Sequence, residues 1–254
     1  MADIQVLIDY LQAAVPDAYA RLVGAAPEQI TALTDLLGYP LPPVYAGFLE
    51  MFGLNDGDLF ADEGATTHIE AVIGYYRGLR AQYPEANFEA CTVFAVGEDF
   101  EGFALLNDGS ADPPVTMPEN GMPVLFPADL IDKATFREAF GRGLVAERFT
   151  GFLLIKAFML EAGRLGGKAH CVVDTDTTAA SNCAVEAARK AGFEPETFSD
   201  RGFLCARHPE ALLSGHLGLR KSAFGVSAKD APTAVRLRDH FAAEIARTGL
   251  EVGI

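Results

Sequence analysis

The chain has 254 residues, half of them hydrophobic, and a formal net charge of −15 at pH 7. The length fits one large or two small domains, and the hydrophobic content is enough for a packed core, which excludes a disordered chain. The four cysteines show no CxxC spacing, so neither a zinc site nor a disulfide framework is indicated.

The sequence contains no segment that resembles a membrane span or a signal peptide. The longest apolar run, residues 152–160, is interrupted by Lys156 and is too short to cross a bilayer. The first residues lack the basic region that opens a signal peptide. We therefore expect a cytoplasmic protein with reduced cysteines and no membrane contact.

The negative charge is confined to the first part of the chain. Residues 1–165 carry 24 acidic and 9 basic side chains, whereas residues 166–254 carry 11 of each. A surface of this kind repels nucleic acid and anionic membranes and attracts basic partners. Solubility is an alternative reason for the same charge, and charge alone leaves both open.

Proline and glycine residues divide the first 57 residues into short helices. Apolar spacing predicts a helix over residues 3–15, which Pro16 ends, and a second over residues 27–37, with Gly38 as a left-handed cap. The proline-rich residues 40–43 cannot continue that helix. A third helix over residues 44–52 follows, and the turn at residues 53–57 ends it.

The pattern of the helices over residues 27–37 and 44–52 resembles the opening of the SUKH superfamily. These are the Smi/Knr-type proteins, known chiefly as bacterial immunity proteins and as a yeast cell-wall regulator. The matching positions are Ile30, Leu37, Gly38, Leu41, Pro42, Tyr45, Phe48, Leu49 and Gly57. A weaker similarity covers residues 91–108. The resemblance implies an antiparallel sheet with packed helices and an immunity protein that binds and occludes a toxin domain, often a nuclease.

The next elements complete an acidic first domain. A helix is expected over residues 69–82, and strands over residues 92–96 and 103–106 are joined by a glycine- and acid-rich turn. Short strands at Val115 and at residues 124–126 and helices over residues 129–140 and 146–164 follow. The glycines after Leu165 mark the boundary, which gives domains of residues 1–165 and 166–254.

The second domain has a different order of elements. Strands are expected over residues 169–173, 203–206, 223–226 and 250–252, and helices over residues 178–191 and 234–247. This βαββαβ order predicts a small ferredoxin-like sandwich. The predicted fold class of the whole chain is therefore α+β, a SUKH-like domain followed by this unit.

One alternative function is an acyl- or phosphoryl-transfer enzyme in the second domain. Asp174 and Asp176 follow an apolar strand, as the nucleophile and the acid/base of haloacid-dehalogenase-type phosphotransferases do. The acidic pair that would bind magnesium is missing downstream, and a cap on the next helix explains the same residues. A near match to a phosphate loop begins at Gly215, but Arg220 replaces its last glycine and no strand is expected directly before it.

The function that we favour from the sequence is non-enzymatic binding of a basic protein partner. A scaffold or regulatory role is a further alternative. No catalytic residue, cofactor or metal site is predicted, and no nucleic acid is expected as a partner. The candidate partner-binding residues are the acids of two turns, namely Asp56, Asp58, Asp62, Glu63, Glu98, Asp99 and Glu101.

Overall fold

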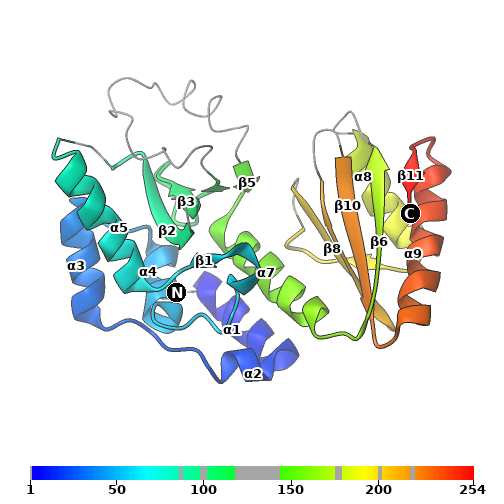
Figure 1. Cartoon of the computed structure of the whole chain (residues 1–254), viewed down its shortest axis with the longest axis horizontal. Helices are drawn as coiled ribbons and strands as arrows, with labels where there is room; N and C mark the ends of the chain where they lie inside the picture. The colour runs from blue at the N-terminus through cyan, green and yellow to red at the C-terminus, as the bar shows by residue number, and fades with distance from the viewer. Residues whose placement is uncertain are drawn as a thin grey trace. The chain divides into compact units, whose positions relative to one another are not determined.

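The structure is a computed structural model of the whole chain, and it describes residues 2–85, 88–97, 102–117, 144–174, 179–199, 202–217 and 221–254. The chain divides into two compact units, Met1–Leu153 and Leu154–Ile254, and each contains helices and one sheet (Figure 1). Within the described residues all paired strands are antiparallel, so the predicted α+β class is confirmed. The predicted boundary after residue 165 stays a prediction.

The first unit packs helices against a sheet with the strand order β1-β2-β3-β4-β5. Its elements are α1 (Ala2–Ala14), α2 (Pro16–Tyr19), α3 (Pro27–Leu37), α4 (Pro43–Phe52), η1 (Ala61–Glu63), β1 (Ala65–Thr66), α5 (Ile69–Gln82), β2 (Cys91–Gly97), β3 (Gly102–Leu106), β4 (Val115–Thr116), β5 (Leu144–Ala146) and the start of α7 (Phe149–Gly163). The β2–β3 pair and the helices α3, α4 and α5 confirm the predictions. The sequence analysis does not predict β1 or β5, and the predicted strand 124–126 and helix 129–140 lie outside the described residues.

Local signals explain the paired helices α3 and α4. Pro27 occupies the first turn of α3, and Gly38 ends the helix with a φ of 85°, a left-handed conformation that suits glycine. Pro42 is the N-cap of α4, where a missing amide proton costs little. The turn between them is therefore specified by residue type.

Aromatic side chains form the core of the first unit. Phe48 of α4 stacks on Phe52 with ring centroids 5.0 Å apart, and Phe94 of β2 meets Phe149 of α7 edge to face at 4.8 Å. Tyr45 is completely buried and also contacts Phe94 and Phe149. Helix α4, strand β2 and the start of α7 are thereby held together through ring contacts.

A β-bulge at Phe94 interrupts the pairing of β2 with β3. Val93 lies opposite Ala104 and Ala95 lies opposite Phe103, so Phe94 has no residue opposite it. Beside the bulge, the amide of Val93 donates a hydrogen bond of 2.7 Å to the hydroxyl oxygen of the buried Tyr76. This tyrosine hydroxyl therefore satisfies a backbone donor next to the irregular part of the ladder.

Tyr76→Phe is expected to lower the free energy of unfolding by about 1–3 kcal/mol, because it leaves the buried Val93 amide without its acceptor while keeping the ring. Urea unfolding followed by circular dichroism measures the change. Tyr83→Phe is the control, since Tyr83 lies at the surface at the end of α5. Equal stability of the two variants would contradict the assigned role.

The second unit is a six-stranded sheet with the order β11-β6-β10-β9-β8-β7. Its elements after α7 are β6 (Gly167–Asp174), α8 (Ala179–Lys190), β7 (Glu194–Pro195), β8 (Phe203–His208), β9 (Ala211–His216), β10 (Lys221–Ala228), α9 (Ala231–Ala246) and β11 (Val252–Gly253). The predicted helices and the strands predicted over residues 169–173, 203–206 and 223–226 are present, the last strand is Val252–Gly253 and shares one residue with the predicted 250–252, and β7 and β9 are additional. The prediction that no strand runs into Gly215 is wrong, because β9 contains it.

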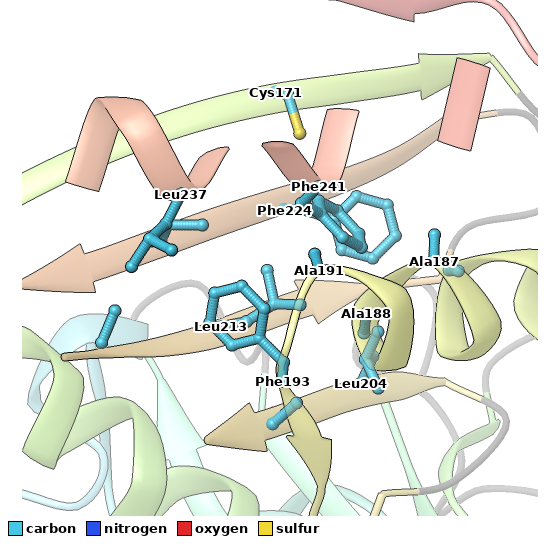
Figure 2. Close-up of a cluster of buried hydrophobic side chains, with 14 of the residues drawn as sticks. Cys171, Ala187, Ala188, Ala191, Phe193, Leu204, Leu213, Phe224, Leu237 and Phe241 are labelled. Carbon is cyan, nitrogen blue, oxygen red and sulfur yellow. The ribbon is translucent and has the colours of Figure 1, made fainter. Parts of the chain in front are cut away.

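Helices α8 and α9 cover one face of this sheet. Alternate residues of the strands point toward them, including Cys171 of β6, Leu213 of β9 and Phe224 of β10, and Phe224 meets Phe241 of α9 edge to face at 5.1 Å (Figure 2). Gly215 is required here because a Cβ at this position would lie 2.2 Å from the Phe224 ring. The first glycine of the stretch that resembles a phosphate loop is therefore a packing requirement.

The C-terminal end of α7 packs against the opposite face of this sheet. The guanidinium of Arg207 in β8 donates two hydrogen bonds, of 2.9 and 2.7 Å, to the carboxylate of Glu161 in α7, and it also pairs with Glu196. Phe158 of α7 packs against Phe198 with ring centroids 6.1 Å apart. The last turns of α7 thus belong to the second unit, as the division at Leu154 indicates.

Candidate functional site

The predicted acidic residues occupy the segment between α4 and α5. Asp56 and Asp58 lie in the turn after α4, and Asp62 and Glu63 lie in the short helix η1. Asp58, Asp62 and Glu63 are exposed, whereas Asp56 is half-buried. The other three predicted residues, Glu98, Asp99 and Glu101, lie outside the described residues, so their part in binding stays a prediction.

The turn that carries Asp56 and Asp58 is held by its own side chains. Asn55 Oδ1 accepts a hydrogen bond of 2.9 Å from the amide of Gly57, and Asp56 Oδ1 accepts one of 3.0 Å from the amide of Asp58. Gly57 and Asp58 both have left-handed backbone conformations, with φ of 72° and 75°. Asp58 is the single non-glycine residue with positive φ in the described parts of the chain, a conformation that aspartate tolerates better than most residues.

Asp56 links this turn to the segment before α5. Its Oδ2 accepts a hydrogen bond of 2.7 Å from the hydroxyl of the buried Thr67. Burial raises the pKa of the Asp56 carboxyl, and the hydrogen bonds from Thr67 and the Asp58 amide partly oppose that rise. Asp56 therefore has a structural role in addition to the contact role predicted for it.

Asp58 forms an ion pair across the surface. Its Oδ2 lies 2.6 Å from a terminal guanidinium nitrogen of Arg21, which also donates to the carbonyl oxygen of Gly57 at 3.2 Å. Arg21 is brought here because Val23 forms a β-bridge with Asn55. The sequence analysis misses this cation, because the two residues are far apart in the chain and no local pattern connects them.

The acidic turn forms one wall of an open pocket with a volume of about 210 Å³. Carboxylate, amide, hydroxyl and imidazole groups line it together with apolar atoms, and the lining residues are Leu54, Asn55, Asp56, Asp58, Phe60, Ala61, Ala65, Thr66, Thr67 and His68. His68 is the N-cap of α5, where its Nδ1 accepts a hydrogen bond from the amide of Glu70. Both lining carboxylates already have partners within the chain, Asp56 with Thr67 and Asp58 with Arg21.

The residues of the enzymatic alternative are only partly described. Asp174 is the last residue of β6 and lies opposite Lys221 of β10, and Asp176 is outside the described residues. His170 is exposed and Cys171 is buried on the other face of β6, so the two cannot act as a base and a nucleophile together. In the described ranges, no group of three or more His, Cys, Asp or Glu residues could hold a metal ion.

Among the helices in the described ranges, none has the length and apolar character needed to cross a membrane. Comparison of the chain with protein-family models, with curated proteins and with solved structures gives no match.

Proposed function

We propose that this chain is a non-enzymatic binding protein whose first unit docks a basic protein partner through the acidic segment Asp56–Glu63. The observation that carries this proposal is the exposure of Asp58, Asp62 and Glu63 on one short segment beside an open, acid-lined pocket. The excess of acids over bases in residues 1–165 supports the same conclusion, because long-range attraction speeds the approach of a basic partner.

The SUKH resemblance of residues 27–57 extends the proposal to a class of partner. We assign to the chain the role of a cytoplasmic immunity protein that occludes a toxin domain, with a nuclease as the favoured kind. A nuclease has a basic groove for its substrate, so an acidic surface competes with nucleic acid for the same groove. Of the residues that carry this resemblance, Ile30 and Leu37 lie in α3, and Tyr45, Phe48 and Leu49 lie in α4.

The first test is whether the gene next to this one encodes a toxin domain, and the second is the rate at which the chain associates with that domain. The double variant Asp62→Lys/Glu63→Lys is expected to slow association on the order of tenfold at low salt and to change dissociation little, as for charges on an interface rim. The wild-type rate is expected to fall steeply as salt rises to physiological strength, where screening acts over ~8 Å.

The control variant is Glu28→Lys/Asp35→Lys, which makes the same charge change at exposed positions of α3. An equal loss in both double variants would place the contact elsewhere on the acidic surface. Turnover of an acyl or phosphoryl donor that disappears in Asp174→Asn would contradict the non-enzymatic proposal.

A further inference from the structure

Strand β6 in the second unit has an edge that is only partly covered. The strand has eight residues, and β11 lies beside one end of it, where it pairs with Val172 and Val173 (Figure 1). Among the described residues no other strand lies on this side, because β10 pairs with β6 on the opposite side. The edge over residues 167–171 is therefore open. Such an edge presents backbone donors and acceptors that can pair with a strand of another molecule.

One side chain of α9 reaches this open edge. Arg238 donates a hydrogen bond of 2.9 Å from a terminal guanidinium nitrogen to the carbonyl oxygen of His170. Its Nε donates to Oδ1 of Asp239 at 2.6 Å, and only 14% of the Arg238 side chain is exposed. The guanidinium is thus oriented by a carboxylate and mostly removed from solvent. Its contact with the edge is therefore more ordered than that of a fully solvated arginine.

Side chains bind backbone groups at both edges of this sheet. At the edge formed by β8, the hydroxyl of Ser199 bonds to both the carbonyl and the amide of Cys205, at 2.8 and 3.0 Å. At the edge formed by β6, Arg238 binds the carbonyl of His170. Backbone groups of a strand alternate in direction, so those of Lys168 point to the same open side as those of His170. Arg238 therefore occupies one acceptor on an edge that is otherwise ready to pair.

We propose that Arg238 prevents this edge of β6 from pairing with the same edge of a second copy of the chain. Two β6 strands related by a two-fold axis at Ala169 run antiparallel and place Lys168 of each copy opposite His170 of the other. Both residues then turn an amide and a carbonyl toward the second copy, as a hydrogen-bonded antiparallel pair requires. The pair is self-complementary, because lysine faces histidine rather than lysine and the residue on the axis is small.

The guanidinium opposes this pairing in two ways. It occupies the His170 carbonyl, which the second copy needs as an acceptor. It also places a positive charge where strand pairing would bury it, and charged side chains at sheet edges discourage association for this reason. Removal of Arg238 is expected to free the acceptor and remove the charge in both copies at once.

The experiment measures self-association of the full chain by sedimentation equilibrium. Arg238→Met keeps the apolar stem and removes the donor. Its dimerisation constant is expected to exceed that of the wild type on the order of tenfold or more, because pairing then satisfies a carbonyl in each copy. Arg236→Met is the control, since it removes the same charge from an exposed position of α9 that pairs with Glu210, and it is expected to leave self-association unchanged.

Amide hydrogen exchange shows whether the association uses this edge. In the Arg238→Met dimer the amides of Lys168 and His170 are expected to exchange on the order of tenfold more slowly than in the wild type. Addition of Lys168→Pro removes one of these donors at an edge position where proline is tolerated. The double variant is expected to lose most of the gain in dimerisation.

A folded Arg238→Met that self-associates no more than Arg236→Met would overturn the inference, as would association without protection of the two amides. If dichroism shows that Arg238→Met is unfolded, Arg238→Lys takes its place in the test. A single ammonium nitrogen replaces the two guanidinium nitrogens that bind His170 and Asp239, so a smaller gain in dimerisation is expected, and no gain would then overturn the inference. None of these outcomes bears on the function proposed for the first unit.

Discussion

Tyr45→Ala is expected to lower the free energy of unfolding of the first unit by about 3–5 kcal/mol, as large-to-small changes at buried aromatic positions do. Tyr45 has no exposed surface, and its ring lies 6.0 to 6.4 Å from the rings of Phe48, Phe94 and Phe149. Its removal leaves a cavity among three aromatic side chains from three elements, which cannot close without moving one of them.

The hydroxyl of Tyr45 provides a matched control. Within the described part of the chain this buried oxygen has no hydrogen-bond partner, and burial raises the pKa of Tyr45 because the phenolate is poorly solvated there. Tyr45→Phe removes the unpartnered group and keeps the ring, so we expect stability to be unchanged or to rise by about 1 kcal/mol.

The two variants are compared by urea unfolding followed by tyrosine fluorescence, which reports on the first unit because all seven tyrosines lie before residue 84. A loss in Tyr45→Phe as large as that in Tyr45→Ala would show that the hydroxyl, and not the ring, carries the stability. A loss near zero in Tyr45→Ala would mean that the ring is not part of the core.

The paired helices α3 and α4 could be predicted from the sequence because their signals are local. The left-handed conformation of Gly38 and the position of Pro42 before a helix are properties of single residues, and the apolar spacing on each side needs no distant contact. The same holds for the strand pair β2 and β3, whose turn residues and β-branched runs lie close together in the chain.

Strand β9 could not be predicted because the reason for its glycine is a contact between strands. When only its neighbours are considered, Gly215 reads as the first glycine of a near match to a phosphate loop. The ring of Phe224 on the adjoining strand occupies the space of its side chain, and the pairing of β9 with β10 places the two residues opposite each other. Sequence patterns carry no information on such a pair until the register is known.

The candidate site was predictable in charge but not in arrangement. The acidic character of the Asp56–Glu63 segment follows from the residues themselves, whereas the burial of Asp56 depends on Thr67 and the ion pair of Asp58 depends on Arg21. The first contact closes the loop between α4 and α5, and the second joins residues 37 positions apart in the chain. Sequence reasoning consequently treats the acids as equivalent, although one supports the turn and another is paired at its surface.

Gly167→Ala is expected to lower the free energy of unfolding of the second unit by about 3 kcal/mol, at the upper end of the usual range for overpacking. Gly167 begins β6 and lies against the N-terminus of α9. A Cβ at this position would be 2.0 Å from the carbonyl carbon of Asp230 and 2.4 Å from the amide nitrogen of Ala231. These are backbone atoms, so the clash cannot be relieved by turning a side chain.

The same clash would displace Asp230, which is the N-cap residue of α9. The Asp230 side chain accepts a hydrogen bond of 2.8 Å from the amide of Thr233, and this cap is lost if Asp230 moves away from β6. Gly163→Ala is the matched control, because a Cβ there meets no atom of the described structure within 4 Å. Alanine in this last position of α7 is expected to leave stability unchanged or to raise it by up to about 1 kcal/mol.

Tyrosine fluorescence and circular dichroism together show which of the two units loses stability in Gly167→Ala. The second unit contains no tyrosine and the chain contains no tryptophan, so its unfolding changes the dichroism without a direct fluorescence signal. Gly167→Ala is expected to shift the dichroism transition to lower urea while the tyrosine transition stays in place. A matching shift of both transitions would mean that the two units unfold as one cooperative structure, and wild-type stability in Gly167→Ala would contradict the close approach of β6 to α9.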